Sequence, residues 1–95
     1  MEEVTQIKLA QMFQQNEFEE LASHPQLALA PAEIVQKLAA AQNWRVRESL
    51  ALNPALVNFP EAITSLSTDI EPRVRSCLAG NPALQRQANI RKKLK

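Results

Sequence analysis

Four arginines form two similar pairs in the C-terminal half of the chain, Arg45 with Arg47 and Arg73 with Arg75. In each pair the arginines flank a single valine, and the second pair follows the first by 28 residues. A guanidinium group carries a permanent charge and five N–H donors in a planar fork, a geometry that matches phosphate and carboxylate. The residue types and their spacing therefore predict anion-binding groups, for a phosphate or for an acidic peptide.

The arginines belong to a segment that the chain repeats. The sequence from Trp44 to Leu56 returns with few changes from Pro72 to Leu84, and a weaker copy over Leu21 to Leu27 lies 29 residues before its counterpart. Periods of this length are typical of stacked units, each of which buries its apolar face against its neighbours. Equivalent arginines should then lie one above another. We divide the single domain, residues 1–95, into an N-terminal cap helix at 1–15 and repeats at 16–43, 44–71 and 72–95.

The repeated arginines suit a structural role as well as a functional one. In the structural role, Arg47 and Arg75 pair with carboxylates of their own or the adjacent unit, since repeated charges commonly join neighbouring units. In the functional role they bind an anion, and Arg45 and Arg73 are the pair that we expect to be freer. The carboxylates considered as structural partners are Asp69, Glu48 and Glu61.

A second basic feature lies near the C-terminus, where Arg86, Arg91, Lys92 and Lys93 fall in or beside a segment, about residues 87–94, that we expect to be helical. Such a tract suits a nucleic-acid backbone or an acidic partner, and the alternative is a solvated last helix whose end frays. No aromatic residues interleave these charges. Contact with a nucleic acid would therefore be mainly electrostatic.

Two single residues have both a structural and a functional interpretation. Trp44 is the only tryptophan, a type enriched at binding hot spots, but it starts a helix where the other copy has Pro72, so we expect it to pack over the junction between units. His24 stands where the other copies have Asn53 and Asn81. We expect it to stabilise a local turn, because no nucleophile or carboxylate is fixed beside it by spacing.

The composition is that of a small helical domain. Of the 95 residues 45% are hydrophobic and only 4% aromatic, and one glycine in the whole chain argues against hairpins and phosphate-binding loops. One cysteine and one histidine form neither an internal disulfide nor a zinc ligand set, so we expect no cofactor. Cys77 is expected to be a small buried group in preference to a reactive thiol.

Charge is unevenly distributed, although the net charge is only +1. Residues 1–43 carry about −4 and residues 44–95 about +5. The first residues, Met1-Glu2-Glu3, are acidic where a signal peptide is basic, and no apolar run approaches the length of a membrane span. We therefore expect a cytoplasmic protein in a reducing compartment, without membrane contact.

Prolines and asparagines mark where helices should begin and end. Pro31, Pro60 and Pro72 are expected at the first position of a helix, and Asn53 and Asn81 are expected to cap a short turn over the Pro-Ala-Leu that follows each of them. In the cap helix, Glu2 to about Gln14, we expect one broad apolar side, and Asn16 should cap the next short helix. That apolar side comprises Val4, Ile7, Leu9, Met12 and Phe13.

The pattern Val-Arg-x-x-Leu-Ala-x-Asn-Pro-x-Leu, found at Val46 to Leu56 and at Val74 to Leu84, resembles the leucine-rich repeat variant family of helical solenoids. The resemblance implies a short right-handed α-solenoid of about three two-helix repeats, with 3₁₀ or short α turns, related to HEAT arrays. The spacing here is longer than is typical of that family, and the cysteine cluster of some members is absent. The resemblance implies no activity for particular residues.

We expect a non-enzymatic binding module whose partner is a protein, because no acid, base and nucleophile are brought together by a recognisable spacing. Nucleic-acid binding through the repeated arginines and the basic C-terminal segment is the alternative. The C-terminal end of the predicted stack lacks an obvious polar cap. Symmetric pairing of the last units of two copies, as a homodimer, or weak head-to-tail stacking would cover it.

Overall fold

The computed structural model describes residues 2–84, and the regular elements in that range are all helical. The prediction of an all-α chain is confirmed for this part of the sequence. Within it, no helix is long and apolar enough to cross a lipid bilayer. The elements are α1 (Glu2–Gln14), α2 (Phe18–Ala22), η1 (Leu27–Leu29), α3 (Ala32–Ala39), α4 (Trp44–Ala51), η2 (Pro54–Asn58), α5 (Pro60–Ser67) and α6 (Pro72–Ala79), where η denotes a 3₁₀ helix.

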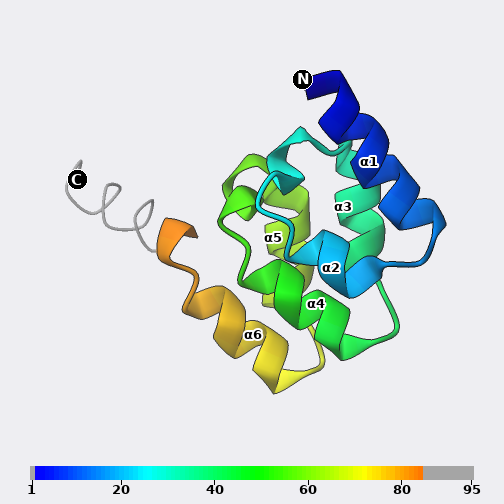
Figure 1. Cartoon of the computed structure of the whole chain (residues 1–95). Helices are drawn as coiled ribbons and strands as arrows, with labels where there is room; N and C mark the ends of the chain where they lie inside the picture. Colours follow the sequence, from blue (N-terminus) through cyan, green and yellow to red (C-terminus); the bar gives the residue numbers. More distant parts are fainter. Residues whose placement is uncertain (1, 85–95) are drawn as a thin grey trace, which may run out of the picture.

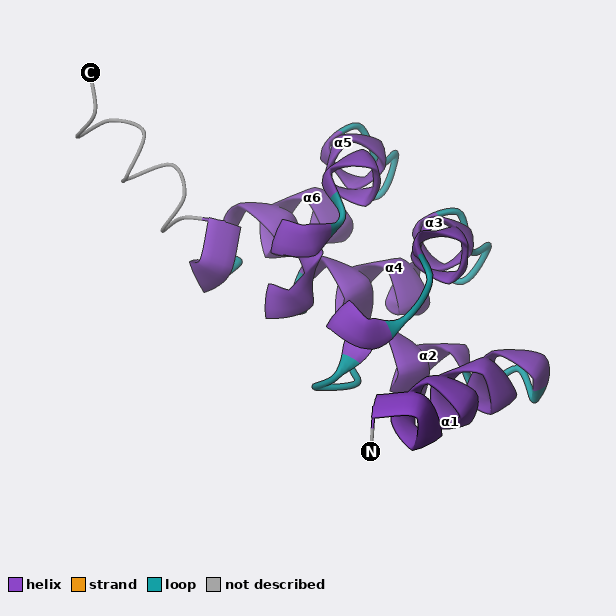
Figure 2. Ribbon diagram, turned by 90° about the horizontal axis from the view of Figure 1, so that it is seen from above, coloured by secondary structure: helices purple, strands orange, loops and turns teal. Residues whose placement is uncertain are grey.

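The helices lie in two layers, with α1 added at one end (Figures 1 and 2). One layer holds α2, α4 and α6 side by side, and α4 packs against both of the others. The second layer holds α3 and α5, which pack against each other and against α4 and α6. Helix α1 covers α2 and η1. The order of helices along the first layer thus follows the order of the sequence repeats.

Equivalent residues of the last two repeats occupy equivalent environments. Val46 and Leu50 lie one turn apart on the buried side of α4, with 3% and 0% of their surface exposed. Val74 and Leu78 take the same places on α6, with 0% and 8% exposed. Because side chains four residues apart share one face of a helix, the repeated valine and leucine form one apolar seam between the layers.

Side-chain caps and prolines mark several helix starts. The side chain of Asn43 accepts a hydrogen bond from the Arg45 N–H, 3.0 Å away, and Glu71 accepts one from the Arg73 N–H at 3.4 Å. The prolines expected at the starts of α5 and α6 occupy the first helical turn. Pro31 differs by one position, because its ψ of 146° is extended and the helix begins only at Ala32.

The prediction that Asn16 caps the start of α2 is wrong. Asn16 has a φ of 62°, in the left-handed region, and ends α1. Its N–H donates to the Phe13 carbonyl at 3.2 Å, and the Glu17 N–H donates to the Met12 carbonyl at 2.9 Å. This pair of bonds is a Schellman motif, in which asparagine, like glycine, tolerates the left-handed conformation. Asn16 therefore reverses the chain so that α2 folds back on α1.

The expected broad apolar side of α1 is also wrong. Val4 and Ile7 are 69% and 59% exposed, whereas Leu9 and Met12 are buried and Phe13 is half-buried. At about 100° per residue, the first two side chains leave the helix nearly opposite the other three. The apolar residues of α1 thus form two separate faces, and only the face of Leu9, Met12 and Phe13 packs on the core.

Two buried asparagines form hydrogen bonds between consecutive sequence repeats. The Asn53 amide donates to the carbonyls of Ala22 and His24 at 2.8 and 3.0 Å, and Asn53 is 5% exposed. The fully buried Asn81 repeats the arrangement one unit later, donating to Ala51 and Asn53 at 2.8 and 3.0 Å. The sequence predicted these residues only as local caps. We call these two side chains and their bonds the asparagine ladder.

The expected capping role is confirmed as well. The side-chain oxygens of Asn53 and Asn81 accept hydrogen bonds from the N–H groups of Ala55 and Ala83, at 2.9 and 3.1 Å. In the first repeat, His24 Nδ1 accepts from the N–H two residues later, at 3.0 Å. The local turn role predicted for His24 is therefore confirmed, with an imidazole nitrogen in place of the amide oxygen.

Candidate binding edge

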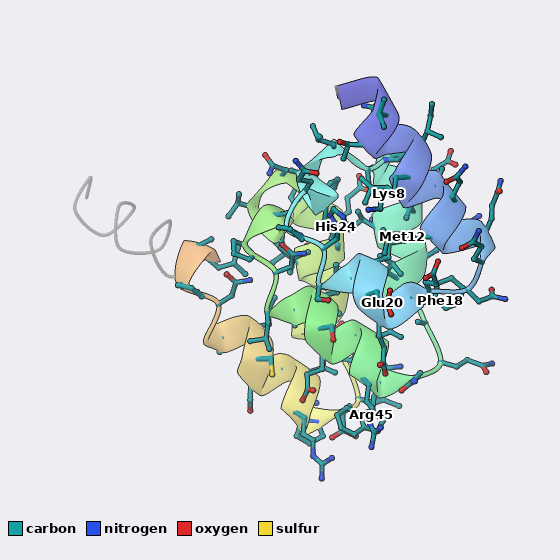
Figure 3. All side chains as sticks on the ribbon, in the orientation of Figure 1. Lys8, Met12, Phe18, Glu20, His24 and Arg45 are labelled. Carbon is teal, nitrogen blue, oxygen red and sulfur yellow. The ribbon has the colours of Figure 1, made fainter. Side chains whose placement is uncertain are left out.

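The first turns of α4 and α6 lie side by side and bring together residues from two repeats. Helix α4 begins at Trp44 and α6 at Pro72, so Arg45 and Arg73 occupy the second position of their helices. Figure 3 labels Arg45 at this end of the layer. We call the surface formed by Trp44, Arg45 and Arg73 the arginine edge.

The indole of Trp44 is the centre of the arginine edge. The guanidinium carbon of Arg73 lies 4.8 Å from the centroid of the indole ring, and that of Arg45 lies 5.7 Å from it. Both distances are within the range of a cation–π interaction. Trp44 is half-buried and packs against the core. It therefore contacts the next repeat, as expected, and also holds two cations at the surface.

Arg73 has only weak electrostatic compensation. Its side chain is 67% exposed, and its Nε lies 4.0 Å from the Glu71 carboxylate, at the outer limit of an ion pair. The same carboxylate accepts the Arg73 main-chain N–H. An exposed pair at this distance contributes at most a few tenths of a kcal/mol. Arg45 is exposed too, so the edge presents two positive charges to solvent.

Arg47 has a structural role. Its guanidinium binds Asp69 through two bonds, Nε to Oδ2 at 2.7 Å and Nη2 to Oδ1 at 3.2 Å, with both side chains largely buried. Its Nη1 donates to the carbonyls of Ala41 and Gln42, in the loop before α4. Arg47 thus joins the loop before α4 to the loop before α6, as the structural alternative describes.

Arg75 contacts the same loop through a different group. Its Nη1 donates to the main-chain carbonyl of Asp69, and the residue is otherwise exposed. Of the other carboxylates considered as partners, Glu61 accepts a hydrogen bond from Gln36 at 2.9 Å. The four arginines therefore divide into Arg47 and Arg75, which hold the Asp69 loop, and Arg45 and Arg73, which gather around Trp44.

An apolar pocket lies on the other side of the first turn of α4. The aromatic rings of Phe13 and Phe18 meet there at 5.5 Å between centroids, and Lys37 Nζ lies 5.4 Å from the Phe13 ring. We call it the Phe13 pocket. No sequence motif predicts this pocket, because its lining residues come from four helices. The two nearby phenylalanines are the one sign of it in the sequence. It is lined by Phe13, Phe18, Lys37, Leu38, Ala41, Gln42, Asn43 and Val46.

Cys77 lies beside Glu48 of the neighbouring helix. Burial raises the pKa of the Cys77 thiol above its ordinary value of 9.0, and the charge of Glu48 and a hydrogen bond to its carboxylate raise it further. The residue is half-buried and is a free thiol, not part of a disulfide. The thiol is therefore protonated at neutral pH.

Four of the basic residues singled out from the sequence are not described by the structure. Arg86, Arg91, Lys92 and Lys93 lie outside the described residues, as does the rest of the repeat at 72–95 after Leu84. Between residues 2 and 84, no three His, Cys, Asp or Glu side chains are grouped to hold a metal ion. The candidate site is thus the arginine edge and the Phe13 pocket beside it.

With this geometry established, we compared the chain with known proteins. No protein-family model, curated protein or solved structure matches it.

Proposed function

We propose that the chain is a non-enzymatic helical-repeat module that binds a protein partner through the arginine edge. The observation that carries the proposal is the pair of exposed guanidinium groups held at 4.8 and 5.7 Å from the Trp44 ring. Tryptophan and arginine are the residue types that contribute most to protein interfaces. A side chain held against a ring loses little further freedom when it binds a carboxylate.

The proposal includes the fold that presents this edge. We propose a short α-solenoid of the leucine-rich repeat variant type, in which each repeat adds one helix to each layer. Support comes from the similar burial of Val46 and Val74 and from the asparagine ladder, whose donor residues lie 28 positions apart. A stack of this kind aligns the first turns of successive helices along one edge. That alignment brings Arg73 to the ring of Trp44.

Nucleic-acid binding is the alternative, and Trp44 gives it some support, since an exposed ring beside arginines can stack on a base. The Trp44 ring already carries Arg73 at 4.8 Å, however, and is half-buried. The two guanidinium groups of the arginine edge neutralise few phosphates by themselves, which gives weak binding at physiological salt. The observations therefore favour a carboxylate-bearing protein.

The test is capture of partners by the immobilised chain from nuclease-treated lysate of its source cells, compared with two charge-reversed variants. Arg73→Glu changes the edge, while Lys8→Glu makes the same charge change on the exposed surface of α1. The acidic residue suits the N-terminal turn of α6, so the first variant should fold. We expect wild type and Lys8→Glu to capture the same proteins and Arg73→Glu to lose them. Equal capture by all three would overturn the proposal.

A separate titration tests the alternative. The chain is titrated with a single-stranded and a duplex oligonucleotide at several salt concentrations. Trp44 is the only tryptophan in the sequence, so its emission reports directly on the edge. A steep fall of log affinity with log salt, removed by Arg73→Glu, would replace the protein partner with a nucleic acid. We expect no binding at physiological salt.

A further inference from the structure

We infer that the partner segment is a short, extended acidic peptide, which places an apolar side chain in the Phe13 pocket and a carboxylate on Arg45 and Arg73. This inference rests on the proposed function and adds the chemistry of the bound segment to it. Two observations carry it. They are the excess of positive charge at the arginine edge and the position of an apolar pocket within a few residues' reach of that charge.

The charges select an acidic segment. Arg45, Arg73 and Lys37 are all exposed around the first turn of α4. The nearby Asp69 carboxylate is occupied by Arg47, with 7% of its side chain exposed, and so presents little charge. Glu71, 4.0 Å from Arg73, and Glu48, on the next turn of α4, partly offset the arginine edge. The positive charge that remains in excess favours an acidic partner.

The pocket selects an apolar side chain. Phe13 and Phe18 form one wall, and both are half-buried although they pack against each other. Ala41 and Val46, a small residue and a buried branched one, also line the pocket. A leucine-sized or phenyl side chain would bury the exposed parts of both rings and so remove apolar surface from water. Lys37 at the rim matches an acidic residue next to it.

The two features are close enough for one short segment. Asn43 and Val46 line the pocket, and Trp44 and Arg45 stand between them in the sequence. The pocket and the arginine edge therefore flank the same helical turn, with α2 on one side and α6 on the other. Neighbouring packed helices lie about 8–10 Å apart, a distance that roughly three extended residues span. The expected motif has an acidic residue about three positions from an apolar one.

A library of random twelve-residue peptides, displayed on phage and selected on the immobilised chain, tests the motif without a known partner. We expect the selected peptides to combine Asp or Glu with an aliphatic or aromatic residue about three positions away. A selected peptide is then synthesised, and its affinity is measured by Trp44 fluorescence. Replacing its acidic residue by the amide, or its apolar residue by alanine, should each weaken binding about tenfold or more.

Matched protein variants assign each half of the motif. Arg73→Glu should weaken the acidic peptide about tenfold and leave its amide form almost unaffected. Ala41→Leu fills the Phe13 pocket without touching a charge, and should weaken the parent peptide but not its alanine form. Lys8→Glu is the control for net charge. Circular dichroism of each variant shows whether the helices are retained.

The outcomes separate this inference from the proposed function. Selected peptides without acidic residues, or affinities that neither Arg73→Glu nor Ala41→Leu changes, overturn the motif while a binding module remains. Failure to select any peptide, together with capture of a protein that Arg73→Glu abolishes, means that a folded surface binds the edge, and the inference is wrong. Loss of edge-dependent capture overturns the proposed function itself.

Discussion

The side-chain amide of Asn81 donates a hydrogen bond to the main-chain carbonyl of Asn53, 3.0 Å away, and so joins two residues at the same place in consecutive repeats. The same amide donates to Ala51, and the side-chain oxygen caps the next turn through the Ala83 N–H. One fully buried side chain thus makes a cap inside its own repeat and two bonds to the repeat before it. A cap alone contributes about 1 kcal/mol, and a buried carbonyl left without its donor costs about 1–3 kcal/mol.

Asn81→Ala should therefore destabilise the protein by about 2–4 kcal/mol, measured by urea unfolding. Asn58→Ala is the matched control. The Asn58 amide makes a bond to Ala55 on the exposed surface, so its loss should cost below about 1 kcal/mol. Asn81→Asp keeps the capping oxygen but loses the donor, and should cost at least as much as the alanine variant. A nearly neutral aspartate variant would show that only the cap matters.

His24→Asn should fold with stability within about 0.5 kcal/mol of the wild type, since an asparagine oxygen takes the place of the Nδ1 that accepts the Gln26 N–H. His24→Ala removes that acceptor and should cost about 0.5–2 kcal/mol. Thermal unfolding of the three proteins makes the comparison. If asparagine is as costly as alanine, the imidazole has a role beyond the turn.

Asp69→Ala should cost about 3–5 kcal/mol, because it leaves the largely buried Arg47 guanidinium without its carboxylate. Arg47→Ala should be similarly costly, and the double variant should cost clearly less than the two single costs added together. Arg75→Ala loses one exposed bond and should cost below about 1.5 kcal/mol. Additive costs in the double-mutant cycle would contradict a coupled pair.

Cys77 should react slowly with iodoacetamide at neutral pH, because its raised pKa keeps the thiol protonated. Glu48→Gln removes the charge that helps to raise the pKa and should speed alkylation, whereas Glu33→Gln, in the first turn of α3, should not. The folded chain binds the thiol proton more tightly than the unfolded chain. The stability contributed by Cys77 therefore falls as pH rises past 9.0, the ordinary pKa. Equal rates in folded and urea-unfolded protein would contradict this.

The features that the sequence predicts correctly are those that recur at the same position of each repeat. Asn53 and Asn81 cap their turns through N–H groups two residues away, and Val46 and Val74 are buried alike because helical spacing places each on the apolar side of its helix. The ion pair of Arg47 was predicted as one of several alternatives. The repeat indicates which arginines can pair with a neighbouring unit. That the partner of Arg47 is Asp69 depends on how the loop before α4 approaches the loop before α6.

The features that were missed depend on where the chain reverses. The left-handed Asn16 turns α2 back on α1, and this reversal pairs Phe13 with Phe18 and opens the pocket beside α4. Hydrophobic spacing alone does not show which side of α1 faces that turn. The contact of Trp44 with Arg73 was also missed, because the other copy has Pro72 in place of tryptophan and no repeated pattern indicated it.

The hydrogen bonds of the asparagine ladder all run in one direction along the chain. Each amide donates only toward lower residue numbers, so the segment 44–71 offers acceptors to the repeat after it and a donor to the repeat before it. A tandem duplicate of that segment would meet the same donors and acceptors at its new junction, so the asparagine ladder itself would continue through an added repeat. His24 carries no amide, and so suits the position at which the series begins.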